Sequence, residues 1–206
     1  IGECAPGRAM VVDKKTYQIG GFYYPGSEWG KTAVTPARAF IEDPNYLKDV
    51  IACEECGWFG LKEENSSECP FCGNPHLSIS RQMMRPWGFA PKNAESIPDA
   101  QLDEEFTAVQ QPLYSTLPES DNINLIPGFK NVRMASRTNQ RIIMLNCGEN
   151  DKGFIVCKDC GAAMPGDNSK ALEDVSRPYK SKYLRTQCRH SNTVNVNLGY
   201  DFVTDM

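Results

Sequence analysis

The chain has 206 residues, of which 40% are hydrophobic and 23% are charged, and its formal net charge is -4. This mild acidity argues against a protein whose whole surface binds nucleic acid, so any such site must be a local basic patch. No apolar run approaches the roughly 18 residues that a membrane-spanning helix needs. The chain begins with Ile1 and lacks the pattern of a signal peptide, and we expect it to be a piece of a longer protein.

Most of the nine cysteines stand in Cys-x-x-Cys pairs. That spacing fits metal sites in a reducing compartment better than it fits a framework of disulfides. We therefore expect a cytoplasmic, metal-binding protein.

The first part of the chain, residues 1–91, is predicted to be largely β. The β-prone runs 10–12 and 17–24 flank a polar turn and predict a hairpin. Residues 37–50 predict either one short helix or two turns broken at Pro44.

Two Cys-x-x-Cys pairs stand twelve residues apart, and each is followed directly by glycine. In such a turn two thiolates point at one centre, and the glycine lets the backbone curl beneath the sulfurs. The alternatives are a redox pair or structural disulfides, but a thioredoxin-like site needs a single pair at the end of a βαβ strand. The spacing thus predicts a zinc ribbon whose ligands are Cys53, Cys56, Cys69 and Cys72.

Residues 92–121 carry seven acidic side chains, one lysine and three prolines, without hydrophobic periodicity. This composition predicts an acidic linker or an excursion across the surface. It separates residues 1–91 from a second β-rich part, residues 122–206. The predicted fold class is mainly β, a small antiparallel scaffold with two zinc-ribbon-like knuckles.

The second part contains another Cys-x-x-Cys-Gly turn at Cys157 and Cys160, followed downstream by Cys188 and His190. These four residues predict a second zinc site, with Cys147 as an alternative fourth ligand. The competing interpretation is a half-site that has lost its metal, with buried thiols that behave as small apolar groups.

Basic residues are concentrated in two runs of the second part, and tyrosines are interleaved in the later one. Such runs suit phosphate contact and base stacking, although a solvated strand face would have the same composition. The candidate nucleic-acid contacts are Arg133, Arg137, Arg141, Lys180, Lys182 and Arg185.

The sequence contains no defensible catalytic constellation. Only two histidines are present, and both lie near cysteine clusters. A zinc ion held by four protein ligands has no open position for water. We therefore expect structural zinc sites and no enzymatic activity of this chain by itself.

Several stretches together resemble a known family. They are GECAPGRAMVVDKKTYQIGG, the paired knuckles CEECG and CPFCG, then RPWGFAP, GFIVCKDCGAA and LGYDFVTDM. Taken together and in this order, these stretches resemble the MrfA-like zinc-binding region of superfamily-two DNA helicases. Related regions occur in the antiphage systems DISARM, notably in its DrmB component, and Druantia. One departure concerns the second zinc site: the family usually has a histidine before its third cysteine, and here that stretch has only Ser176, Arg177 and Tyr179.

The resemblance implies a zinc-stabilised accessory module of a DNA helicase or an antiphage defence complex. Its partners would be a helicase motor, in the same or another chain, and DNA, with no membrane and no small-molecule substrate. It does not imply ATPase activity, because the chain has no motor motif. The alternative is a protein-protein scaffold that docks through Trp87, Phe89 and the acidic segment.

Overall fold

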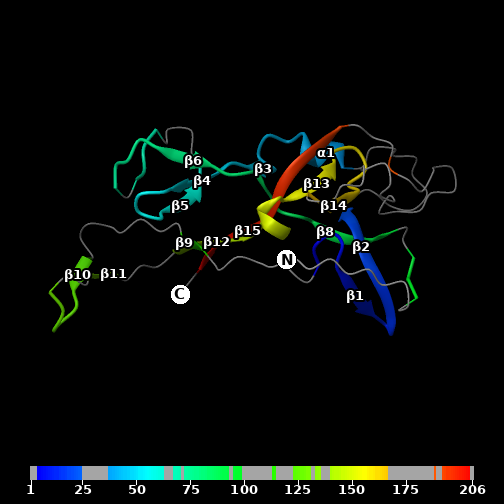
Figure 1. Cartoon of the computed structure of the whole chain (residues 1–206), viewed down its shortest axis with the longest axis horizontal. Coiled ribbons are helices and arrows are strands. Elements are labelled where there is room, and N and C mark those ends of the chain that lie inside the picture. The colour runs from blue at the N-terminus through cyan, green and yellow to red at the C-terminus, as the bar shows by residue number, and fades with distance from the viewer. Residues whose placement is uncertain are drawn as a thin grey trace. The chain divides into compact units, whose positions relative to one another are not determined.

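The computed structural model describes residues 4–24, 37–62, 67–70, 72–92, 95–98, 113–114, 123–130, 133–135, 140–166, 188 and 192–204. This part of the chain is mainly β, as predicted, and almost all of its strand pairs are antiparallel (Figure 1). Within it, no helix is long and apolar enough to cross a bilayer.

The chain divides into two compact units, each built from non-consecutive segments. Unit 1 comprises Ile1–Lys48, Arg81–Gln110 and Leu145–Gly199, and unit 2 comprises Asp49–Ser80, Gln111–Met144 and Tyr200–Met206. The sequence predicted consecutive parts separated by residues 92–121, most of which lie outside the described residues. That division stays a prediction. The two compact units each combine distant segments, because a β-sheet joins strands without regard to their separation in sequence.

Unit 1 opens with the predicted hairpin. Strands β1 (Ala9–Val12) and β2 (Lys15–Tyr23) pair antiparallel. The two residues between them, Asp13 and Lys14, both have positive φ, 50° and 61°. Two consecutive residues of this kind make the tight turn whose twist matches that of the flanking strands. Strand β8 (Gly88–Pro91) pairs with the other edge of β2.

The remaining elements of unit 1 form a second sheet and one short helix. Strand β13 (Phe154–Cys157) pairs with β14 (Ala163–Pro165) on one side and with β15 (Thr193–Thr204) on the other. Strand β7 (Met83–Met84) runs parallel to β15, and β3 (Leu47–Lys48) pairs with β7. Helix α1 (Arg38–Ile41) ends before Pro44, consistent with the predicted break, and a 3₁₀ helix, η4 (Glu149–Asp151), precedes β13.

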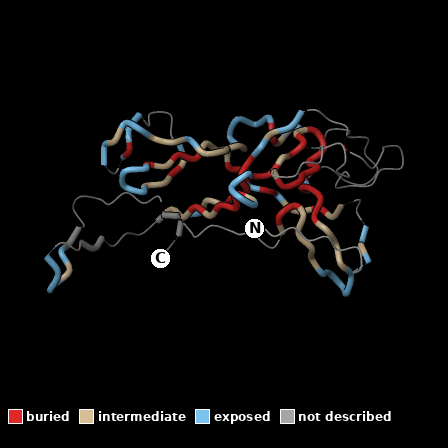
Figure 2. Tube along the Cα trace, in the orientation of Figure 1, coloured by how far each residue is buried: buried red, intermediate tan, exposed pale blue. Residues whose placement is uncertain are grey.

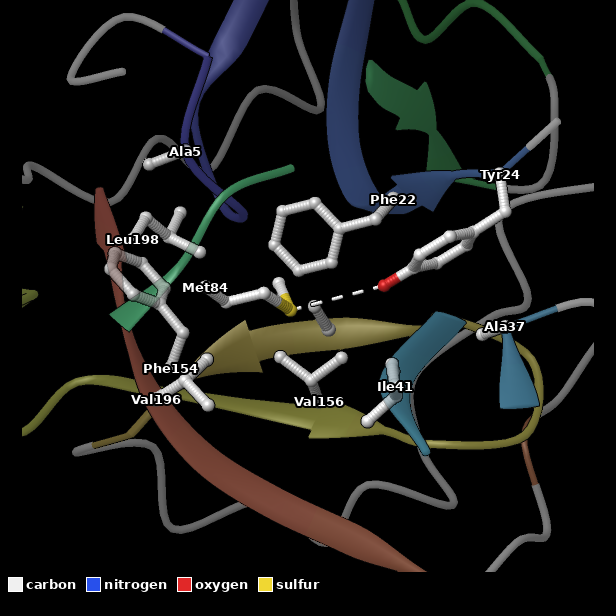
Figure 3. Close-up of a cluster of buried hydrophobic side chains, with 11 residues drawn as sticks. Ala5, Phe22, Tyr24, Ala37, Ile41, Met84, Phe154, Val156, Val196 and Leu198 are labelled. Atoms are coloured by element: carbon white, nitrogen blue, oxygen red, sulfur yellow. Dashed lines mark hydrogen bonds between the residues drawn. The ribbon is translucent and has the colours of Figure 1, made fainter. Parts of the chain in front are cut away.

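Buried side chains from these elements form one hydrophobic core in unit 1 (Figure 3). Phe154 and Val156 of β13 project into it, together with Phe22 of β2 and Leu198 of β15. The hydroxyl of Tyr24 points at the sulfur of Met84, 3.8 Å away. Because side chains alternate along a strand, Ile155 and Cys157 lie on the opposite face of β13 from this core. That face packs a separate cluster of Cys157, Cys160, Ala162, Met164 and Cys188.

Unit 2 contains three small groups of strands. The sheet β5-β4-β6 consists of β4 (Val50–Cys53), β5 (Phe59–Leu61) and β6 (Leu77–Ile79). Strand β9 (Leu113–Tyr114) pairs with β12 (Gln140–Asn146), and β10 (Ile123–Leu125) pairs with β11 (Arg133–Ala135). The buried residues of the β5-β4-β6 sheet lie mainly on β4, and β6 has none (Figure 2).

Candidate metal centres

The three Cys-x-x-Cys-Gly segments fold into the same turn. In each, the glycine amide donates to the carbonyl oxygen of the first cysteine, and that cysteine's amide donates to the carbonyl oxygen of the residue after the glycine. The glycine φ values are 72°, 74° and 77°, a conformation that a residue with a Cβ adopts only with strain. The cysteine and glycine that each first bond joins are Cys53 and Gly57 (2.9 Å), Cys69 and Gly73 (2.8 Å), and Cys157 and Gly161 (2.9 Å).

The first two turns face each other in unit 2 and bring four sulfurs together. The Sγ atoms of Cys53 and Cys72 are 3.6 Å apart, as are those of Cys56 and Cys69, and all four lie within 4.8 Å of one another. A disulfide would place two sulfurs about 2.05 Å apart. A tetrahedral zinc ion with Zn–S bonds of about 2.3 Å would separate its sulfurs by about 3.8 Å. The donor set and its spacing therefore fit a Zn²⁺ site and exclude disulfides.

The second cluster lies in unit 1 and unites three of its predicted ligands. Cys157, Cys160 and Cys188 have no solvent exposure, and their sulfurs lie within 4.8 Å of one another. Cys160 Sγ is 3.6 Å from Cys188 Sγ, again the spacing of thiolates around one metal ion. His190, the predicted fourth ligand, lies outside the described residues.

Cys147, the alternative fourth ligand, is not part of this cluster. Among the described residues of unit 1, the cysteines whose sulfurs fall within coordinating distance of one another are Cys157, Cys160 and Cys188. Cys147 is buried next to Asp151, and burial together with that carboxylate raises the pKa of its thiol to about 12.

Clustering of thiols without a cation disfavours their ionisation. Hydrogen bonds with the sulfurs of Cys157 and Cys188, and then burial, raise the pKa of Cys160 well above its usual range. A divalent cation reverses this balance because it coordinates thiolates directly. Metal binding and deprotonation at this cluster are therefore coupled.

The knuckle of unit 1 is anchored to its surroundings in a way that the sequence did not reveal. Buried Asp159, between the two cysteines, accepts hydrogen bonds from Arg38 Nε at 3.0 Å and Nη2 at 2.6 Å. The same carboxylate raises the pKa of Arg38. The Asp159 carbonyl oxygen also accepts the Ala37 amide at 2.9 Å. These bonds attach helix α1 to the turn across 121 residues of sequence, and no local pattern signals that pairing.

The glycines of the turns differ in how closely the surrounding residues pack against them. A Cβ added at Gly161 would lie 2.9 Å from the Phe22 carbonyl oxygen and 2.9 Å from the Tyr24 ring, whereas one added at Gly57 or Gly73 would meet no atom of the described residues within 4 Å. The unit 1 cluster is thus embedded in packed structure. The unit 2 cluster is partly open to solvent, because two of its ligands, Cys56 and Cys72, are exposed.

The predicted nucleic-acid contacts are only partly described. Arg133 belongs to β11, and Arg141 belongs to β12 with a half-buried side chain. Arg137, Lys180, Lys182 and Arg185 lie outside the described residues. Whether these six form one surface stays a prediction.

The predicted aromatic patch is divided between core and surface. Phe89 packs against the unit 1 core, with its ring centroid 5.8 Å from that of Phe22. Trp87 is 61% exposed and lies edge-on to Phe40, with ring centroids 6.0 Å apart.

The comparison with known proteins gives a similarity that covers the whole chain. The chain is similar to the Druantia protein DruE. It is 30% identical to DruE of Escherichia coli (strain UMEA 4076-1) over 218 aligned residues, which include 100% of the chain. The chain spans 11% of the length of DruE. No protein-family model matches the chain, and no solved structure matches it. The similarity to DruE supports the predicted relationship to the antiphage Druantia proteins, and the cysteine clusters fit the predicted binding of zinc.

Proposed function

We propose that this chain is a zinc-stabilised accessory module of a Druantia-like antiphage protein, which contacts nucleic acid and docks onto a helicase motor. The observation that carries the proposal is the pair of cysteine clusters, in each of which sulfur atoms lie 3.6 Å apart. The chain that holds them aligns with DruE over the whole length of the chain. The proposal assigns one structural zinc ion to each cluster.

The module itself is proposed to have no catalytic activity. The unit 2 cluster supplies four thiolates, which fill a tetrahedral zinc ion and leave no position for a substrate or a water molecule. In unit 1 the three cysteines are completely buried, so a metal ion there would be shielded from solvent. Both arrangements favour a role for zinc in folding.

Contact with nucleic acid is supported by the distribution of charge. Residues 123–148 include four basic side chains and no acidic one, although the whole chain carries a net charge of -4. Locally concentrated positive charge attracts a polyanion even when the overall charge is negative.

Two measurements test the proposal. Elemental analysis of the purified chain should give two zinc ions per molecule. A fluorescence-anisotropy titration with single-stranded and duplex DNA should show binding that weakens steeply as salt is raised. Zinc without salt-sensitive DNA binding would remove the nucleic-acid part of the proposal, and absence of zinc would remove its structural basis.

A second candidate function, a protein-protein scaffold, is favoured by Trp87. Its exposed indole is supported from one side by Phe40, whose ring in turn stacks on that of Tyr24 at 5.3 Å between centroids. Aromatic side chains held rigidly in solvent are typical anchors of protein interfaces. Loss of co-purification with the helicase motor in Trp87→Ala, with unchanged DNA affinity, would favour this function over the first.

A further inference from the structure

The hairpin of β10 and β11 in unit 2 ends in a preformed turn. The register pairs Leu125 with Arg133, at the end of the hairpin where the turn begins. The Phe129 amide donates to the carbonyl oxygen of Ile126 at 3.1 Å, and Gly128 has a φ of 89°. With Pro127 before this glycine, the four residues form a type II turn, in which proline presets one backbone angle and glycine accepts the other without strain. Residues 126–129 therefore need little ordering when a ligand binds.

Two large apolar side chains lie exposed at this turn, one at the end of β10 and one in the turn itself. Leu125 is 60% exposed and Phe129 is 61% exposed. The neighbouring Pro127, Gly128 and Lys130 are exposed as well, and the tip of the β10–β11 hairpin is coloured as exposed in Figure 2. The Phe129 ring is exposed and follows a hydrogen-bonded turn, so it is available to stack on a ligand.

The charge around the tip selects the kind of ligand. Lys130 follows Phe129 directly, and Arg133, Arg137 and Arg141 continue the same acid-free segment. An apolar protein partner would need the exposed rings but no such concentration of positive charge. Aromatic groups interleaved with basic ones match a nucleic-acid strand, which offers bases for stacking and phosphates for ion pairing.

We infer that the β10–β11 hairpin binds single-stranded DNA, with the Phe129 ring stacked on an unpaired base and Lys130 at a neighbouring phosphate. Duplex DNA is the poorer ligand for this tip because its bases are already stacked on one another. The inference rests on the proposed nucleic-acid function and adds to it the strand form and the contacting element.

The test compares variants of the zinc-loaded chain by fluorescence anisotropy with a labelled oligo-dT strand. Phe129→Ala should weaken binding roughly 5- to 150-fold, the range that the loss of one stacked base produces. Phe129→Tyr should keep the affinity, and Phe129→Leu should lose it, because leucine keeps apolar bulk but has no flat ring. Phe202→Ala is the matched control, since Phe202 is an exposed phenylalanine of the same unit outside the hairpin, and it should bind as the parent chain does.

A salt series adds a second readout. Lys130→Gln should make the dependence of binding on salt shallower, by about 0.7 in the slope of log affinity against log salt. Equal affinity of Phe129→Ala and the parent chain would overturn the inference while the proposed function stands. Equal losses in Phe129→Ala and Phe202→Ala would also overturn it, because the effect would not belong to the tip.

Two further outcomes would be equally decisive. If the parent chain binds no DNA, the inference and the nucleic-acid function fail together. If Phe129→Ala abolishes self-association in analytical ultracentrifugation and leaves DNA affinity unchanged, the tip is a contact between copies of the chain and the inference is wrong.

Discussion

We predict that the β5-β4-β6 sheet of unit 2 is too small to be stable without the proposed zinc ion, and this makes Cys69→Ser an informative change. The strands have four, three and three residues. Ordering their backbone costs about 10–20 kcal/mol at about 1–2 kcal/mol per residue. Val50 and Ile51 are the fully buried aliphatic side chains of these strands, and together they contribute about 3–6 kcal/mol.

The midpoints of these ranges leave a deficit of about 10 kcal/mol. Structural zinc sites of this kind contribute about 10–16 kcal/mol at neutral pH, which offsets the deficit with a few kcal/mol to spare. Cys69→Ser replaces a buried thiolate ligand with a poor one, so we predict loss of zinc from this cluster and unfolding of the sheet.

Hydrogen exchange measured by mass spectrometry checks this prediction segment by segment. Peptides from residues 49–62 and 72–80 should lose protection in Cys69→Ser, and peptides from residues 154–164 should keep it because their own cluster retains its ligands. Cys4→Ser is the control, since Cys4 belongs to neither cluster. Unchanged protection of residues 49–62 in a Cys69→Ser protein that has lost this zinc would refute the reasoning.

Three further predictions concern unit 1, with one comparison drawn from unit 2. Gly161→Ala should lower the melting temperature more than Gly57→Ala does. Both positions have positive φ, but only at Gly161 would the added Cβ lie 2.9 Å from the Phe22 carbonyl oxygen. Equal melting temperatures of the two variants would contradict this. Phe154→Ala should reduce the free energy of unfolding by about 3–5 kcal/mol in denaturant titrations, because its ring is fully buried in the core, and a loss below about 1 kcal/mol would mean that the core is misassigned. Burial raises the pKa of Cys147 to about 12 from an ordinary value near 9, so the folded state holds the thiol proton more tightly than the unfolded state does. The contribution of this thiol to the free energy of unfolding is therefore complete below about pH 9 and is lost as the pH rises toward 12. Denaturant midpoints measured at pH 7.5 and 10.5 should therefore fall less in Cys147→Ala than in the parent chain, and identical falls would exclude this contribution.

Much of the local structure was predictable because its determinants are local. The Asp13-Lys14 turn, the end of α1 before Pro44 and the knuckles all depend on residues within a few positions of one another. In each knuckle the carbonyl oxygen of the first cysteine accepts the amide of the residue four positions later. The amide of the same cysteine donates to the carbonyl oxygen five positions later. Spacing in sequence is then nearly equivalent to spacing in space.

The aromatic patch shows where this reasoning fails. Trp87 and Phe89 stand two residues apart in one apolar run, yet one is exposed and the other packs on the core. A run with aromatic residues at alternate positions does not reveal what lies against them. That depends on which strands and helices the fold places there, here Phe40 of α1 against Trp87 and Phe22 of β2 against Phe89.

The sequence by itself determined that four cysteines of unit 2 and two of unit 1 stand in paired turns, because Cys-x-x-Cys-Gly folds into one local turn that aims both sulfurs. Only the tertiary structure decided that Cys188, 28 residues beyond Cys160, joins the second cluster while Cys147 turns toward Asp151. It also decided that Arg38 holds the knuckle through Asp159. Contacts at such separations follow from strand pairing and packing across the whole unit, for which no short stretch of sequence carries the information.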